Sequence, residues 1–241
     1  MEAIVREMVS AAVTVALLSA SVVRAQSTQD NRAGVFAGSA QYPLLPRTLE
    51  IELALSAAPK HLRDDAAVWV LEKTGYVKAT SGSSAFSCIV SRRGGDLFPV
   101  CWDAEGARSL LTLDFDDAQL RLAGKSDSEI DAIVAQRFKD GQYHPPSRAG
   151  IAYMLSPLRY RIDGQGHAQR TPSNPHLMFY GPNLTDSDIG GARGSFVFMN
   201  RVGPDGMMIV PVGQKERDSI AAESQSLTAQ LERAIRVQSS R

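Results

Sequence analysis

Residues 85–103 read AFSCIVSRRGGDLFPVCWD and contain the two cysteines of the 241-residue chain, Cys88 and Cys101. Two apolar runs lie on either side of a Gly94-Gly95-Asp96 turn. This arrangement is typical of a β-hairpin, because glycine reaches the positive φ angles that tight turns require. If Cys88 faces Cys101, the numbers of paired residues sum to 189 and residues 93–96 form the tip. The stretch therefore predicts a hairpin whose register permits a cross-strand disulfide.

The N-terminus determines how these cysteines are interpreted. Residues 9–23 form an apolar run of 15 residues, and Val23 and Ala25 are the small residues that signal peptidase reads at −3 and −1. The run is shorter than the roughly 20 residues that a membrane-spanning helix needs. We therefore expect residues 1–25 to be a cleaved signal peptide and the mature protein to be periplasmic or secreted, without a membrane attachment. An uncleaved N-terminal anchor is the alternative.

Export favours a disulfide between the cysteines, because thiol pairs at hairpin spacing oxidise in such compartments. Closing so short a loop would stabilise the fold by about 3 kcal/mol. The alternative is a redox-active pair, which normally has the pattern Cys-x-x-Cys at a helix N-terminus. A separation of 13 residues across a hairpin does not match that pattern. We therefore expect Cys88 and Cys101 to form a structural disulfide.

The charge composition excludes two classes of partner. The chain has 26 basic and 26 acidic residues, so its formal net charge is zero. There is no basic excess to neutralise phosphates, and we therefore expect no nucleic-acid partner. There is also no polybasic segment for an anionic membrane surface.

Strands are expected on the N-terminal side of the hairpin. Residues 66–71 and 76–80 are rich in β-branched and aromatic residues around a Lys73-Thr74-Gly75 turn. Together with the two strands of the cysteine hairpin, they predict four consecutive antiparallel strands.

Helices are expected at four positions before residue 141. Thr48, Asp103 and Asp114 each precede a helical pattern as candidate N-caps, since a side-chain oxygen there can accept from unpaired amides. The fourth start, Ser126-x-x-Glu129, is a capping box.

The second half of the chain is expected to return to strands. The expected segments are a strand at 150–155, a long surface loop at 156–174, a strand at 176–180, a hairpin of 195–199 with 207–211, and a helix at 214–237.

This order of elements predicts an α+β fold rather than alternating parallel units. We expect an antiparallel, disulfide-stapled β-sheet packed with helices and preceded by the cleaved signal peptide. The expected division is a signal peptide (1–25), a flexible leader (26–42), a single α+β domain (43–212) and a C-terminal helix or tail (213–241).

No motif of a known catalytic class is present. The four histidines do not form a His-Glu-x-x-His frame, and the chain lacks both a Gly-x-Ser-x-Gly elbow and a phosphate-binding Gly-x-x-x-x-Gly-Lys loop. These absences remove the motif-bearing classes without deciding whether the protein is an enzyme.

The densest polar and aromatic patch lies at residues 175–191. His176, Met178 and Tyr180 alternate along one strand and therefore share one of its faces, and the loop that follows offers Asp186 and Asp188. Such a group could bind a small ligand or supply general acid–base catalysis. The alternative is an ordinary strand whose other face packs in the core.

Methionines form a second group of candidates in the C-terminal half. Thioethers together with a histidine can hold copper(I) in an exported protein. Methionine also fills gaps in ordinary cores, and no Met-x-x-Met motif is present, so we expect core packing with no metal and no cofactor. The methionines concerned are Met154, Met178, Met199, Met207 and Met208.

Two functional hypotheses follow. The first is a non-catalytic exported module that binds a small molecule or an envelope component through the 156–174 loop and the 176–188 patch. The second is an exported hydrolase of unfamiliar type, in which His176 is the general base and Asp186 or Asp188 orients it. The first requires a concave surface beside the loop, and the second requires a carboxylate within hydrogen-bond reach of His176.

Overall fold

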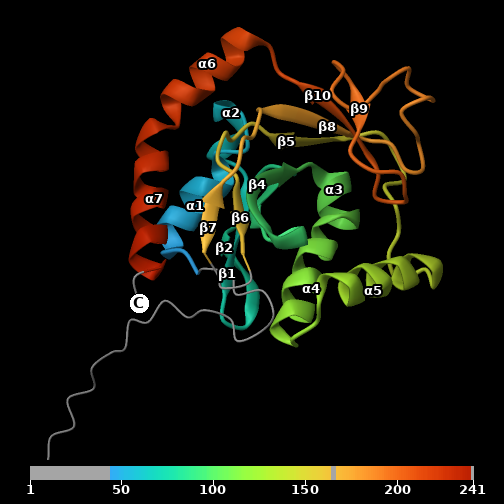
Figure 1. Ribbon diagram of the computed structural model, residues 1–241, viewed down its shortest axis with the longest axis horizontal. Coiled ribbons are helices and arrows are strands. Elements are labelled where there is room, and N and C mark those ends of the chain that lie inside the picture. Colours follow the sequence, from blue (N-terminus) through green and yellow to red (C-terminus); the bar gives the residue numbers. More distant parts are fainter. Residues whose placement is uncertain (1–43, 164–166, 240–241) are drawn as a thin grey trace, which may run out of the picture. The chain divides into compact units, whose positions relative to one another are not determined.

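The computed structural model of the protein describes residues 44–163 and 167–239 (Figure 1). The expected signal peptide and flexible leader therefore lie outside the described residues. None of the helices in this part of the chain has the length and apolar character needed to span a bilayer.

Ten strands form a sheet that is mostly antiparallel, and helices pack on it, which confirms the α+β class (Figure 1). The main path has the order β2-β1-β3-β4-β5-β8-β10-β9, and β6 and β7 join it through β4. The strands are β1 (Ala67–Glu72), β2 (Gly75–Thr80), β3 (Ser87–Ser91), β4 (Asp96–Trp102), β5 (Ile151–Met154), β6 (Tyr160–Ile162), β7 (Ala168–Arg170), β8 (His176–Tyr180), β9 (Phe198–Met199) and β10 (Met207–Pro211).

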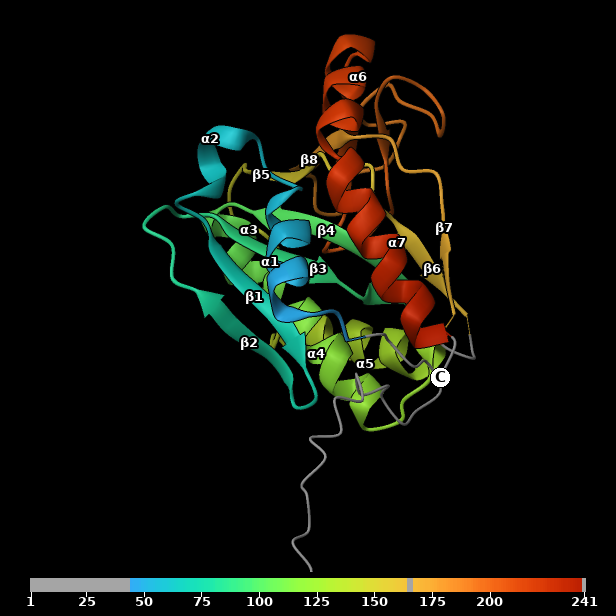
Figure 2. The same ribbon diagram turned by 90° about the vertical axis from the view of Figure 1, so that its left-hand side faces the viewer.

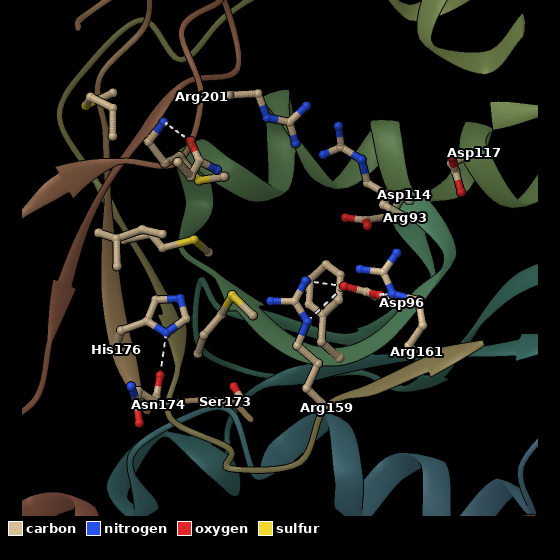
Figure 3. A pocket seen from close by; sticks show the side chains of 18 of the residues that line it. Arg93, Asp96, Asp114, Asp117, Arg159, Arg161, Ser173, Asn174, His176 and Arg201 are labelled. Carbon is tan, nitrogen blue, oxygen red and sulfur yellow. Dashed lines mark hydrogen bonds and ion pairs between the residues drawn. The ribbon is translucent and has the colours of Figure 1, made fainter. Parts of the chain in front are cut away.

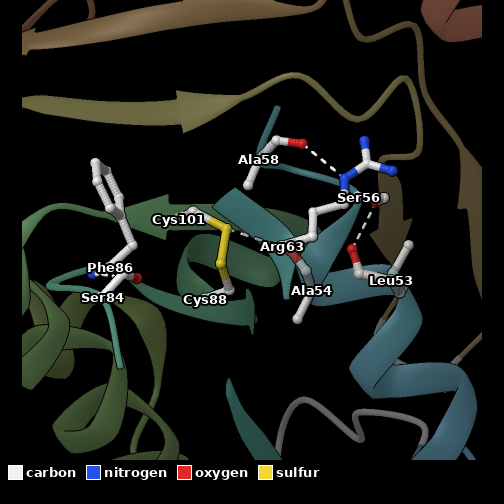
Figure 4. The surroundings of a disulfide bond; sticks show 9 residues. All are labelled: Leu53, Ala54, Ser56, Ala58, Arg63, Ser84, Phe86, Cys88 and Cys101. Carbon is white, nitrogen blue, oxygen red and sulfur yellow. Dashed lines mark hydrogen bonds between the residues drawn. A yellow bond between two sulfur atoms is a disulfide. The ribbon is translucent and has the colours of Figure 1, made fainter. Parts of the chain in front are cut away.

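The cysteine hairpin has the predicted register. Cys88 of β3 lies opposite Cys101 of β4, and the two form a disulfide across a Cα–Cα distance of 4.0 Å (Figure 4). The turn between the strands is the short 3-10 helix η1 (Arg93–Gly95), in which Gly94 and Gly95 have φ angles of 65° and 77°. These left-handed values explain the glycine pair.

The expected run of four consecutive antiparallel strands is wrong, because β1 lies between β2 and β3 and is parallel to β3. The chain after β2 returns to the beginning of β1 instead of turning directly into an adjacent strand. In this connection Gly82 packs so tightly that a Cβ atom would lie 2.3 Å from the Ala67 nitrogen and 2.3 Å from the Asp65 carbonyl oxygen. The Ala67 amide then donates to the Phe86 carbonyl at 2.9 Å, which places β3 beside β1.

The helices begin partly where the sequence predicts. Asp103 caps α3 by accepting from the Gly106 amide at 2.9 Å, and Ser126 and Glu129 form the capping box of α5. Two expected caps are wrong: α1 follows Pro46 rather than Thr48, and Asp114 lies inside the first turn of α4. The helices are α1 (Arg47–Leu55), α2 (Lys60–Arg63), α3 (Ala104–Ser109), α4 (Leu111–Leu122), α5 (Asp127–Lys139), α6 (Gln214–Glu223) and α7 (Gln225–Ser239).

Helices cover both faces of the sheet (Figure 2). On the first face, which carries the disulfide, Leu53 of α1 packs in one core cluster with Leu231 and Ile235 of α7. On the second face, Trp102 of β4 packs in another cluster with Leu110 and neighbouring residues of the α3–α4 segment. The C-terminal helix therefore packs on the sheet layer, and Ser224 divides the predicted single helix into α6 and α7.

The expected surface loop at 156–174 contains two strands. β6 and β7 pair as a short antiparallel hairpin, and a hydrogen bond from the Thr171 amide to the Arg159 carbonyl at 2.9 Å extends this pairing. β6 also pairs with the first residues of β4. Each strand has three residues, too few for alternation to be visible in the sequence. The hairpin brings Arg159 and Arg161 to the second face of the sheet.

Candidate functional site

A cavity of about 780 Å³ opens on the second face of the sheet, between the strands and helices α4 and α5 (Figure 3). Alternation along the strands decides which side chains reach it, because every second residue points to the same face. Its sheet-side lining is Asp96, Phe98 and Trp102 from β4, Met154 from β5, Arg161 from β6, His176 and Met178 from β8, Phe198 and Met199 from β9, and Met207, Ile209 and Pro211 from β10.

One wall of the cavity carries two arginines that share a single aspartate. Asp96 accepts from Arg159 Nε at 2.9 Å and forms an ion pair with Arg161 Nε at 2.6 Å. Arg159 Nη2 also contacts the same carboxylate, and the guanidinium carbon lies 5.6 Å from the centre of the Phe98 ring. The Asp96 side chain is 4% exposed, whereas those of Arg159 and Arg161 are 37% and 56% exposed. The group therefore presents cationic nitrogen to the cavity and keeps its one negative charge buried.

A second arginine pair lies elsewhere in the same cavity. Asp205 Oδ2 lies 3.1 Å from both Arg93 Nη2 and Arg201 Nη1. Arg93 also interacts electrostatically with the negative charges of Asp114 and Asp117 on α4. This pair is therefore more fully neutralised by carboxylates than the pair on Asp96.

Asp114 of α4 is almost completely buried and lies within the electrostatic influence of Arg93. One of its oxygens accepts from the Ser91 hydroxyl. Burial is the largest influence on this carboxyl and raises its pKa to about 6, although the charge of Arg93 and the bond from Ser91 oppose the rise. The site thus contains a carboxyl that changes charge in a mildly acidic range.

We expect this raised pKa to make the folded state less stable as the pH rises from about 4 to about 6. In that range the folded chain holds a proton on Asp114 that the unfolded chain, with a pKa near 3.8, has released. The contribution is fully present below pH 4 and is lost above pH 6. The measurement is the urea midpoint of unfolding at pH 4.5 and at pH 7. The decrease in this midpoint from pH 4.5 to pH 7 should be larger for the wild type than for Asp114→Asn. Equal decreases in the two proteins would contradict the assignment.

His176 lies in the cavity wall with a defined tautomer. Its Nδ1 is 2.7 Å from the Asn174 carbonyl oxygen, which can only accept, so Nδ1 carries the proton (Figure 3). Burial is the largest influence on the imidazole and lowers its pKa below the ordinary value. The positive charge of Arg159 lowers this pKa further, whereas the hydrogen bond to the Asn174 carbonyl raises it. At neutral pH, Nε2 is therefore an unprotonated nitrogen with a free lone pair.

The other predicted site residues have different roles. Tyr180 donates to Asp103 Oδ1 at 2.6 Å, and burial raises the pKa of its phenol. Asp186 accepts from the Met199 amide at 2.6 Å, and Asp188 accepts from the Thr185 amide at 2.8 Å, so both carboxylates organise their loop. None of the three lines the cavity, and within the described residues His176 makes no hydrogen bond to a carboxylate. Of the predicted patch, the structure therefore brings His176 and Met178 to the cavity.

No known protein family, curated protein or solved structure shows a significant match to this chain.

Proposed function

We propose that this is a small-molecule-binding protein whose cavity takes a monoanionic amphiphile, with its charged group on Arg159 and Arg161 and its apolar part along the sheet. The observation that carries the proposal is the pair of partly exposed arginines on one buried aspartate inside a cavity of about 780 Å³. This volume lies within the range of ordinary ligand pockets. The cavity also supplies the concave surface that the binding hypothesis requires, because residues of the 156–174 segment line it.

The charge balance of the Asp96 group favours a single negative charge. Two guanidiniums and one carboxylate leave one formal positive charge, which a carboxylate would neutralise. Arginine presents parallel N–H donors that match the two oxygens of a carboxylate. The stacking of Arg159 on Phe98 leaves the orientation of its guanidinium well defined. The second arginine pair is a poorer site for an anion, since Asp205, Asp114 and Asp117 offset its charge.

The methionines of the sheet-side wall support an apolar ligand body. Met154, Met178 and Met207 are each less than a tenth exposed and belong to the core cluster of the second face. Methionine side chains adapt to ligands of irregular shape, because they are unbranched and polarisable. An anion with an alkyl or aryl portion would therefore find both of its parts accommodated.

The disulfide supports the further proposal that the protein is exported to an oxidising compartment. Both cysteines are paired and completely buried. Structural disulfides of this kind are rare in reducing compartments.

The head-group requirement can be tested by calorimetric titration with octanoate and with octanamide, its neutral counterpart. We expect octanoate to bind at least tenfold more tightly, because charge-assisted hydrogen bonds contribute about 1.5–3 kcal/mol. The double variant Arg159→Gln/Arg161→Gln should lose this preference. The control variant Arg148→Gln, which changes an exposed arginine outside the cavity, should keep it. Equal affinity of the wild type for the two compounds would contradict the proposal.

The hydrolase hypothesis has one specific observation in its favour, the tautomer of His176. A carbonyl that holds Nδ1–H leaves Nε2 as a base facing the cavity, and here Asn174 takes the orienting role that was expected of Asp186 or Asp188. Hydrolysis of 4-nitrophenyl octanoate by the wild type, and its loss in His176→Gln, would favour this alternative over a binding module.

A further inference from the structure

Strand pairing brings a histidine and two methionines together in the cavity wall. Met154 of β5 lies directly opposite His176 of β8, and Ala152 lies opposite Met178. Directly opposed residues on one face of an antiparallel pair have Cβ atoms roughly 4.5–5.5 Å apart. Met178 follows His176 by two residues and shares its face. All three side chains line the cavity, so two thioethers and one imidazole converge on one patch of the sheet.

The histidine is already oriented as a metal ligand would be. Histidines that bind metals almost always donate their other ring N–H to a carbonyl or carboxylate, which fixes the tautomer. The Asn174 carbonyl performs this role at 2.7 Å from Nδ1. Figure 3 shows the ring of His176 in the cavity, with Nδ1 turned toward Asn174. The lone pair that remains for coordination is on Nε2.

We propose that Met154, Met178 and His176 form a binding site for a soft monovalent metal ion, copper(I). Two thioether sulfurs and one imidazole nitrogen are donors that select copper(I) over harder cations. The sequence predicts core packing for these methionines, because methionine commonly fills gaps in cores and no Met-x-x-Met motif is present. The pairing of β5 with β8 supplies the juxtaposition of the three side chains.

The charges around the site are compatible with a monovalent ion. Arg159 is the charged group that acts on His176, and its guanidinium is held by the buried carboxylate of Asp96. The three proposed ligands are neutral, so the bound ion adds a single positive charge beside an arginine that is already paired. A divalent ion would add twice that charge without an anionic ligand among the three.

The test is an anaerobic titration of the full chain with copper(I) in competition with bicinchoninate and without any organic ligand for the cavity. We expect one copper(I) per chain to be withheld from the chelator. The double variant Met154→Leu/Met178→Leu should bind at least 100-fold more weakly, and its fold should be kept because leucine and methionine have similar volumes. The matched control is Met208→Leu, since Met208 does not line the cavity. His176→Gln should also weaken binding and provides a second variant if the double variant does not fold.

A second readout is NMR of the chain labelled with ¹³C in its methionine methyl groups and titrated with silver(I), which has similar ligand preferences. We expect the methyl signals of Met154 and Met178 to shift together and that of Met208 to stay in place. Copper(I) binding by the double variant that equals the wild type, no copper(I) withheld, or shifts confined to other methionines would overturn the proposal. These outcomes are independent of octanoate binding, so failure of the metal site leaves the anion site to be judged separately.

Discussion

Replacing Glu50 by alanine is expected to lower the free energy of unfolding by about 3–5 kcal/mol, because the change breaks a buried ion pair and leaves one partner charged. Glu50 Oε1 accepts from Arg92 Nη1 at 2.7 Å and from the Leu71 amide at 2.9 Å. Both side chains of the pair are 1% exposed. In the variant, the Arg92 guanidinium would have no carboxylate partner and no access to water.

The matched control is Glu52→Ala, which removes an exposed glutamate from the same helix. We expect its urea midpoint to differ little from that of the wild type, since exposed substitutions usually change stability by less than 0.5 kcal/mol. The double variant Glu50→Leu/Arg92→Met should recover part of the loss, because it removes both charges together. An unfolding midpoint of Glu50→Ala equal to that of Glu52→Ala would contradict the role of the pair.

Reduction of the disulfide is expected to have the second largest effect and to lower the free energy of unfolding by about 3 kcal/mol. The bond closes a loop with a sequence separation of 13 residues and restricts the unfolded chain accordingly. Both cysteines are completely buried, and Cys101 Sγ lies 3.5 Å from the Ala54 carbonyl of α1 (Figure 4). Because reductant reaches such a bond only after the structure opens, reduction of the native protein should be slow and should accelerate near the urea midpoint.

The measurement compares urea unfolding of the wild type refolded with and without dithiothreitol, so that the two samples differ only in the bond. The double variant Cys88→Ala/Cys101→Ala should unfold at least as early as the reduced wild type, since it also loses packing around both sulfurs. Coincident unfolding curves for the oxidised and reduced wild type would refute a stabilising role for the disulfide.

The elements that the sequence predicts well are those determined by local interactions. The register of the cysteine hairpin follows from a glycine turn between two short strands, and the capping box at Ser126 follows from residues three apart. The parallel pairing of β1 with β3 depends instead on how residues 81–86 pack against the backbone near Ala67. A local turn signal carries no information about that approach, so the order of the first strands could not be predicted.

Acidic residues near helix starts also show that local sequence patterns do not predict tertiary contacts. Glu50 and Asp114 have positions in which carboxylates commonly favour a helix dipole or cap. Their actual partners are Arg92 and Ser91, which come from the β3 hairpin. Local preference predicts the helices near these residues, whereas the burial of the two carboxylates follows from tertiary packing.

The candidate site was predictable only along one strand. Period-two alternation places His176 and Met178 on one face, and this face does line the cavity. The arginine–aspartate group was missed because Asp96 and Arg159 are separated by 63 residues, and the overall charge balance hides such clusters. The alternation of Arg159 and Arg161 around Tyr160 was the one local signal, and it is too short to establish a strand.

The most direct test of the binding proposal is to observe where octanoate lies in the protein. The measurement is a set of intermolecular nuclear Overhauser effects between octanoate and ¹³C-labelled methionine methyl groups in the metal-free chain. Binding in the cavity predicts contacts from the alkyl chain to Met154, Met178 and Met207, and none to Met208, which does not line it. Contacts to Met208 without contacts to any of the four methionines that line the cavity (Met154, Met178, Met199 and Met207) would place the ligand elsewhere and contradict the proposed function.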